Sequence, residues 1–219
     1  MTKPQDPAND PEPRWPALLA LLAVGALDYA LPKSLLLVPR WLPILVVVLL
    51  LVPTVISYKS NHHFLNWVLG HVVAGVVSTF LVIALGRLLY GLPRHLEEPT
   101  RMLWSAVSLW LSNMLIFALW YWRLDAGGPH ARDLRSGHTN GAFLFPQMTL
   151  DPTQKREMDA DTWSPGFVDY LFIAFNTSTA FSPTDTAALS PWAKILMMLQ
   201  AMISLTVIAL LAARAVNIL

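Results

Sequence analysis

Two long apolar stretches of this chain are separated by the segment Asp169-Tyr-Leu-Phe-Ile-Ala-Phe-Asn-Thr-Ser-Thr-Ala-Phe-Ser-Pro-Thr-Asp185. The segment is too short, and too polar at its end, to cross a bilayer, because a spanning helix needs about 20 apolar residues. A short helix followed by a Thr/Ser-rich loop between two spans is typical of a re-entrant loop. Irregular backbone is tolerated at membrane depth only where it is buried in protein or lines a water-filled cavity. The order of these elements therefore predicts an ion path.

The composition indicates that most of the chain is solvated by lipid. Hydrophobic residues make up 55% of the 219 residues and charged residues only 13%, a balance that no soluble domain of this size requires. The formal net charge of +1, without any basic tract, gives no sign of a nucleic-acid partner. The chain has no cysteine, which excludes disulfides and thiolate metal sites. Nucleophile, phosphate-loop and dinucleotide motifs are also missing, so we expect neither an enzyme nor a bound cofactor or metal.

Five apolar runs are long enough to be read as transmembrane spans. The sequence therefore predicts an all-α integral membrane protein with five transmembrane helices and one re-entrant pore half-helix. The predicted spans cover residues 15–38, 42–57, 64–90, 102–122 and 191–213. Pro32 is expected to kink the first span.

The spans divide the chain into three parts. Residues 1–14 are rich in Pro, Asn and acidic side chains and predict a disordered tail. Residues 15–95 form a bundle of three spans, and residues 96–219 form a pore-like domain. That domain consists of the fourth span, an outer loop over 124–163, a pore helix and loop over 165–189, and the fifth span. The apolar run Phe143-Leu-Phe-Pro146 of the outer loop is expected to dock on the protein or on the membrane interface.

The distribution of basic residues predicts the orientation. Short cytoplasmic loops carry an excess of Lys and Arg. The basic residues beside the short loops and the last span are Lys33, Arg40, Arg87, Arg94, Arg101 and Arg214. With five spans all of them fall on one side, which we expect to be the cytoplasm. This orientation gives a multi-pass protein of a bacterial inner membrane, with the C-terminus inside and the N-terminus outside.

The re-entrant element has a clear start signal. Ser164-Pro165 offers Ser as the N-cap and Pro at the first helical position. The helix is expected to run to about Asn176 and to point the negative end of its dipole at the membrane centre, which favours a cation there. Ser190-Pro191 repeats the start signal and opens the last span. Oxygen ligands at the end of the half-helix would come from Thr177, Ser178 and Thr179.

This region resembles the pore helix, filter and inner helix of potassium channels. Asn176 lies where a pore-helix Glu often sits in that family, and Ala180-Phe181-Ser182-Pro183-Thr184-Asp185 aligns with its Thr-Val-Gly-Tyr-Gly-Asp signature. Ser182 and Thr184 replace the filter glycines, whose backbone angles only Gly adopts at low cost, and Pro183 fixes its own φ. This departure from the potassium-channel filter favours a wider, less selective pore, or a closed plug that does not conduct.

Most of the chain also resembles a bacterial family of integral membrane proteins classed as a domain of unknown function. The shared features are an aromatic pair like Tyr121-Trp122 at the end of a span, a Phe-Pro loop and a C-terminal pattern that begins like Asp-Tyr-Leu-Phe. This resemblance implies an architecture rather than an activity.

Together these features predict a homotetramer that conducts monovalent cations with weak selectivity, because one chain cannot enclose a path with a single half-helix. Residues 177–179 would form the base of the filter, Phe181 to Thr184 the constriction, and Asp185 the outer mouth. Gln200 and Ser204 lie four residues apart on one face of the last span. They either line the cavity below the filter or mediate helix packing in lipid.

Two other functions remain open at this level. The chain is a non-conducting structural or accessory membrane protein if the filter is a plug. A small-solute transporter would use Asp28 of the first span or His71 of the third for proton coupling, because carboxylates inside a membrane are expensive. Asp28 is otherwise expected to form an ion pair with Lys33 or His71.

Overall fold

Apolar helices make up most of the fold. The computed structural model describes residues 11–60, 62–91, 98–135, 138, 140–158, 163–179 and 186–218. Within these ranges, four helices are long and apolar enough to cross a membrane. They are α2 (Trp41–Lys59), α3 (His63–Gly91), α4 (Pro99–Leu124) and α8 (Pro191–Ile218). The prediction of a helical protein with several helices capable of spanning a membrane is therefore confirmed.

Shorter elements complete the chain. The shorter helices are α1 (Trp15–Ala30), α5 (Pro129–Asp133), α6 (Pro152–Glu157) and α7 (Phe167–Thr179). The 3-10 turns are η2 (Lys33–Leu35), η4 (Asp125–Gly127) and η5 (Pro146–Met148). The strands β1 (Phe143–Leu144) and β2 (Ala187–Ala188) form an antiparallel pair in which Phe143 lies opposite Ala188.

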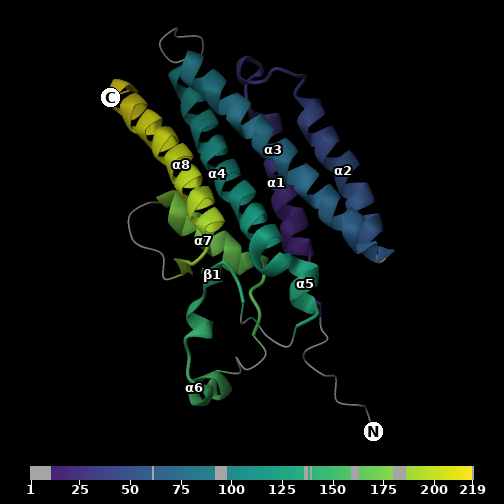
Figure 1. The fold of residues 1–219 in the computed structure, drawn as a ribbon. Helices are drawn as coiled ribbons and strands as arrows, with labels where there is room; N and C mark the ends of the chain where they lie inside the picture. The colour runs from purple at the N-terminus through teal and green to yellow at the C-terminus, as the bar shows by residue number, and fades with distance from the viewer. Residues whose placement is uncertain are drawn as a thin grey trace.

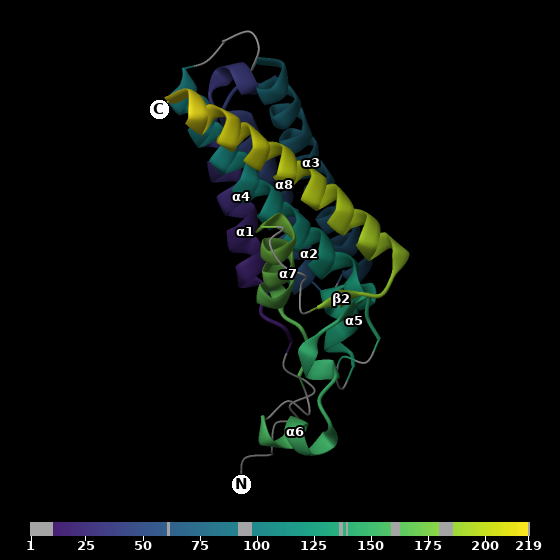
Figure 2. The ribbon, with the colours of Figure 1, turned by 90° about the vertical axis from the view of Figure 1, so that its left-hand side faces the viewer.

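Helix α4 lies at the centre of the bundle (Figures 1 and 2). It packs against α1 and α3 on one side and against α7 and α8 on the other, while α2 packs on α1 and α3. Consequently 61% of the most apolar window of α4 is buried, against only 17% of that of α8. Most of the apolar surface of α8 is therefore free to contact lipid or another chain.

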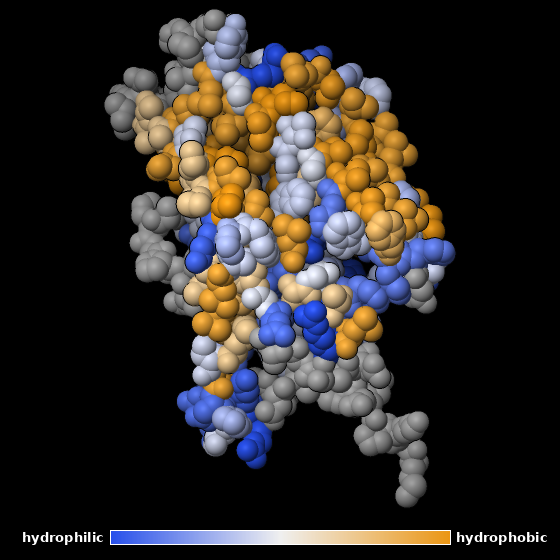
Figure 3. All heavy atoms as spheres, in the orientation of Figure 1, coloured by the Kyte–Doolittle hydropathy of each residue, from blue (hydrophilic) through white to orange (hydrophobic). Residues whose placement is uncertain are grey.

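The outer surface of the long helices is strongly apolar. Figure 3 shows hydrophobic residues over the helical bundle and polar residues gathered at the end that carries α6. Leu49, Ile56 and Val82 are each more than half exposed, as are Met202 and Leu205 on α8. Water-soluble proteins rarely expose an apolar surface of this extent, whereas lipid tails are as apolar as these side chains. The surface is that expected of a multi-pass membrane protein.

The first apolar helix is shorter than the sequence suggested. α1 ends at Ala30, well before the predicted end at Val38, and η2 and a turn follow it. Pro32 explains this end, because proline disfavours helical backbone in the preceding residue, and Leu31 is extended (φ −65°, ψ 146°). Pro32 therefore ends the helix instead of kinking it. With 16 residues, α1 is about 24 Å long, shorter than a hydrocarbon core of about 30 Å.

The start of α7 also differs from the prediction. The helix begins at Phe167 rather than at Pro165, because the carboxylate of Asp169 accepts the Gly166 N–H at 2.7 Å and fixes Gly166 as the N-cap. The start of α8 is as predicted. Pro191 is its first residue, and the Ser190 hydroxyl accepts the Ala193 N–H at 3.3 Å.

The apolar run of the outer loop docks on the bundle, as predicted. Phe143 is fully buried, and its ring makes edge-on contacts with the rings of Tyr121, Tyr170 and Trp192. Because β1 pairs with β2, this docking also holds the chain that enters α8 against the end of the bundle.

Candidate functional site

The C-terminal end of α7 meets the middle of two long helices. Trp110 of α4 donates a hydrogen bond from Nε1 to the Ser178 carbonyl oxygen at 3.4 Å. Gln200 of α8 donates from Nε2 to the Ala174 carbonyl oxygen at 2.7 Å and to Ser178 Oγ at 2.8 Å. Gln200 lies nine residues after the start of α8, which corresponds to roughly 14 Å along the helix axis. The carbonyl end of α7 is therefore held near the mid-level of the long helices.

These contacts belong to a buried polar group that we call the mid-bundle cluster. Its members come from α4, α7 and α8, and each of them is fully buried. They are Asn113, Tyr121, Ser178, Gln200 and Ser204. The Tyr121 hydroxyl donates to Gln200 Oε1 at 2.5 Å, and Asn113 Nδ2 donates to Ser204 Oγ at 2.8 Å. A hydrogen-bonded network of this kind fixes one register between helices that apolar packing alone would allow to slide.

The predicted oxygen ligands of the filter base are bonded within the chain. The Thr177 hydroxyl donates to the Ile173 carbonyl at 2.8 Å, and the Thr179 hydroxyl donates to the half-buried Asn176 carbonyl at 3.0 Å. The Ser178 hydroxyl faces the mid-bundle cluster. The remaining predicted filter residues, Ala180, Phe181, Ser182, Pro183, Thr184 and Asp185, lie outside the described residues.

Gln200 and Ser204 share one face of α8, and that face packs inside the chain. Both side chains are fully buried between α4, α7 and α8. The sequence left two roles open for this pair, lining a cavity or packing between helices. In this single chain both side chains pack between helices. The sequence identified the pair by spacing but gave no sign of its partners Asn113 and Tyr121.

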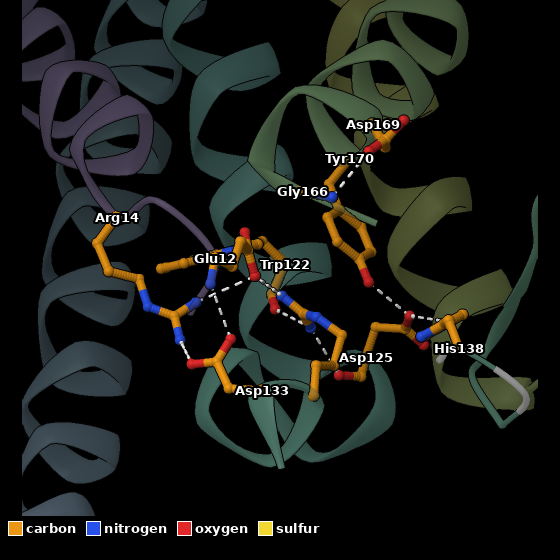
Figure 4. A network of polar contacts seen from close by, with 10 residues as sticks. Glu12, Arg14, Trp122, Asp125, Asp133, His138, Gly166, Asp169 and Tyr170 are labelled. Carbon is orange, nitrogen blue, oxygen red and sulfur yellow. Dashed lines mark hydrogen bonds and ion pairs between the residues drawn. The ribbon is translucent and has the colours of Figure 1, made fainter. Parts of the chain in front are cut away.

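A second polar group lies at the end of the bundle that carries α5 (Figure 4). We call it the outer network, and its members are Glu12, Arg14, Arg132 and Asp133. Arg14 forms ion pairs with Glu12 at 3.0 Å and with Asp133 of α5. Arg132 donates to the Trp122 and Asp125 carbonyls at 2.9 and 3.0 Å and forms an ion pair with Glu12. The last residues of the predicted disordered tail are therefore fixed across the outer loop.

Asp125 connects the outer network to α7. Its carboxylate is completely buried and accepts hydrogen bonds from the Tyr170 hydroxyl at 2.6 Å and from the Ala142 N–H at 2.5 Å. His138 Nε2 lies 3.4 Å from the same carboxylate. Gly141 allows this close approach, because a Cβ there would lie 2.5 Å from His138 Nε2. Nothing in the sequence predicted this site, because its members are distant in the chain and share no motif.

Two histidines stack at the same end of the molecule. The rings of His63, the first residue of α3, and His130, in α5, are nearly parallel, with centroids 3.6 Å apart. Burial, followed by the neighbouring His63, lowers the pKa of His130 below its ordinary value of 6.5. Within the described ranges, no group of three His, Asp or Glu side chains is arranged to hold a metal ion.

The two residues of the transporter hypothesis lie apart from both polar groups. Asp28 is buried in α1, and among the described residues it forms neither of the ion pairs expected with Lys33 or His71. His71 Nδ1 lies 2.7 Å from the Trp67 carbonyl oxygen of its own helix.

Comparison of the chain with protein-family models, with curated proteins and with solved structures found no match.

Proposed function

We propose that the chain is the subunit of a weakly selective cation pore, built from four copies around a common axis. The observation that carries this proposal is the position of α7. This helix of 13 residues ends beside the middles of α4 and α8. Its length of about 20 Å is too short to cross a bilayer, so α7 is re-entrant in this proposal. Its carbonyl end carries partial negative charge, which favours a cation at mid-membrane.

The proposed topology has five crossings. α2, α3, α4 and α8 cross a bacterial inner membrane, α1 makes the fifth crossing together with the chain that follows it through η2, and α7 enters the membrane from outside. Arg40, which precedes α2, and Arg101, in the first turn of α4, line one surface hollow at the end opposite the outer network. The assignment of that end, and of the C-terminus, to the cytoplasm rests on the basic residues that the sequence places beside its short loops.

The exposed face of α8 supports assembly around an axis. Ile195, Met198, Met202 and Leu205 are each more than half exposed. Their spacing of three, four and three residues places them on one helix face, opposite the face that carries the buried Gln200. In the proposed tetramer this stripe faces the axis beneath α7. The assignments of Phe181 to Thr184 as the constriction and of Asp185 as the mouth remain predictions.

The decisive experiment measures assembly and flux on the full chain. Native mass measurement in lipid nanodiscs is expected to give a tetramer, and liposomes are expected to show cation flux that does not saturate. Thr179→Val removes a hydroxyl beside the proposed filter and is expected to lower the flux at least threefold. The control is Thr79→Val in α3, because the Thr79 hydroxyl also donates to a carbonyl of its own helix, that of Gly75 at 2.8 Å, but α3 does not pack on α7. A strict monomer would contradict the proposal, and a tetramer without flux would indicate a plug.

A proton-coupled transporter is the second candidate, and one observation favours it. Asp28 is only 2% exposed, and its Oδ2 atom has no hydrogen-bond partner among the described residues. Buried carboxylates within apolar helices are commonly functional. This candidate predicts flux that saturates with solute, depends on pH and is lost in Asp28→Asn, whereas the pore predicts that Asp28→Asn leaves cation flux unchanged.

A further inference from the structure

A cavity of about 220 Å³ lies among α1, α2, α3 and α4, beside the outer network. Its interior is apolar and includes the buried side chains of Leu21, Leu51, Val73 and Leu119. An engineered apolar cavity of about 150 Å³ stays dry and binds benzene, so a space of this size is large enough for part of an acyl chain.

A buried cation at this cavity has no counter-ion among the described residues. Arg123 of α4 lines the cavity and is only 8% exposed. Its contact with an aromatic ring is to Trp122, with the guanidinium carbon 5.4 Å from the ring centroid. Within the described part of the chain, no carboxylate or hydrogen-bond acceptor pairs with it. A buried guanidinium without a partner is strongly unfavourable, so this position is suited to an anion from outside the chain.

Gly70 of α3 provides the space for this guanidinium. A Cβ at Gly70 would lie 1.6 Å from Arg123 Nη1. Any side chain at position 70 would therefore push the guanidinium away from its place. The juxtaposition of Gly70 and Arg123 defines the polar end of the cavity.

The mouth of the cavity is basic. Lys59, His63 and His130 line it together with Arg14, whose charge is already neutralised by Glu12 and Asp133. None of the described residues that line the cavity is acidic. An apolar interior that ends at an unpaired cation, behind a basic mouth, is complementary to a molecule with an anionic head and an apolar chain.

We propose that this cavity binds an anionic single-chain amphiphile. Its carboxylate or phosphate oxygens contact Arg123, and the first part of its acyl chain lies against Leu21, Leu51 and Leu119. A small soluble anion would leave the apolar walls unused, and an uncharged lipid would leave Arg123 unpaired. A free fatty acid and a lysophospholipid share the required chemistry. The proposal does not depend on the pore function.

The first test uses the unmodified full chain in neutral detergent. Native mass measurement and thermal unfolding compare oleate, lysophosphatidylglycerol, zwitterionic lysophosphatidylcholine and uncharged oleyl alcohol. We expect at least tenfold tighter binding of an anionic probe than of oleyl alcohol, with a rise in unfolding temperature. Binding of oleate alone would identify a fatty-acid site, and binding of lysophosphatidylglycerol would identify a lipid-headgroup site. Equal binding of oleate and oleyl alcohol would overturn the proposal.

The second test changes the polar end of the cavity. Arg123→Gln removes the charge, and Gly70→Ala keeps the charge but displaces the guanidinium. Each is expected to weaken binding of the anionic probe at least tenfold. The matched control is Gly75→Ala on the same helix, because a Cβ at Gly75 would meet nothing within 4 Å. If Gly70→Ala folds and binds as the control does, the assigned site is wrong.

Discussion

At the scale of single residues, Asp125 joins α4, α7 and the outer loop. It accepts hydrogen bonds from the first turn of α7 and from the outer loop while lying at the end of α4. A buried carboxylate is tolerated only when its oxygens are bonded, and here the Tyr170 hydroxyl and the Ala142 N–H provide those bonds. Three segments are thereby fixed by one side chain.

The first prediction concerns removal of this carboxylate. Asp125→Ala leaves the Tyr170 hydroxyl and the Ala142 N–H buried without an acceptor, and each such group costs about 1–3 kcal/mol. We therefore expect a loss of about 2–6 kcal/mol in the free energy of unfolding, measured in mixed micelles. Asp151→Ala is the control, because Asp151 caps the exposed helix α6. An equal loss in both variants would contradict the assigned role.

The second prediction concerns pH. Because the pKa of His130 is lowered in the folded chain, the unfolded chain binds more protons between that lowered value and about 6.5. The free energy of unfolding is therefore expected to fall as the pH is lowered from about 6.5 through the pKa that His130 has in the folded chain. Protonation of His130 there places a charge beside the stacked ring of His63. His130→Phe keeps a stacked ring and should flatten this dependence. The control is His62→Phe, which changes the histidine next to the stacked pair and should leave the pH dependence as it is. Unfolding midpoints across pH 4.5–7.5 provide the measurement.

At the scale of elements, α7 depends on side chains of its neighbours. Its polar residues at positions 177 and 179 bond within the helix, whereas its carbonyl groups at Ala174 and Ser178 accept bonds from Gln200 and Trp110. The helix is thus held at one depth by donors from α8 and α4. A helix of this length has little stability of its own, so these contacts decide its position.

The third prediction tests this dependence. Gln200→Leu is nearly isosteric but removes the bonds to Ala174, Ser178 and Tyr121. Hydrogen bonds between helices in membranes contribute roughly 0.6–2 kcal/mol each, so we expect the loss of three to cost about 2–6 kcal/mol in all. The loss should appear first as faster hydrogen exchange of the α7 amides. Thr206→Val, an exposed change on the same helix, should leave that exchange unaltered.

At the scale of the whole molecule, burial is unevenly distributed. α4 is surrounded by four helices, whereas α8 contacts α4 and α7 and leaves one apolar stripe uncovered. The uncovered stripe is free to contact lipid or, in the proposed tetramer, further copies of the chain.

The fourth prediction uses the absence of cysteine from the chain. Met202→Cys places a single thiol on the stripe, at a position that is 66% exposed. In the proposed tetramer, a short bis-maleimide is expected to link such thiols into covalent dimers in native membranes. Val82→Cys on α3 is the control, because it is similarly exposed and apolar but lies away from α8. Equal yields from both variants would indicate random collision rather than assembly.

The sequence by itself determined the helical class, the long apolar helices and the start of α8 at Ser190-Pro191, because runs of apolar residues and capping signals are local. Tertiary structure decided the rest. The bonds of Asp125 to Tyr170 and of Tyr121 to Gln200 join residues 45 and 79 positions apart. Whether Gln200 faces a cavity or a neighbouring helix follows from which helices pack around α8. Likewise, only the surroundings of Arg123 leave it without a counter-ion among the described residues. Periodicity fixes which residues share a face, but the partner of that face is set by the packing of the whole chain.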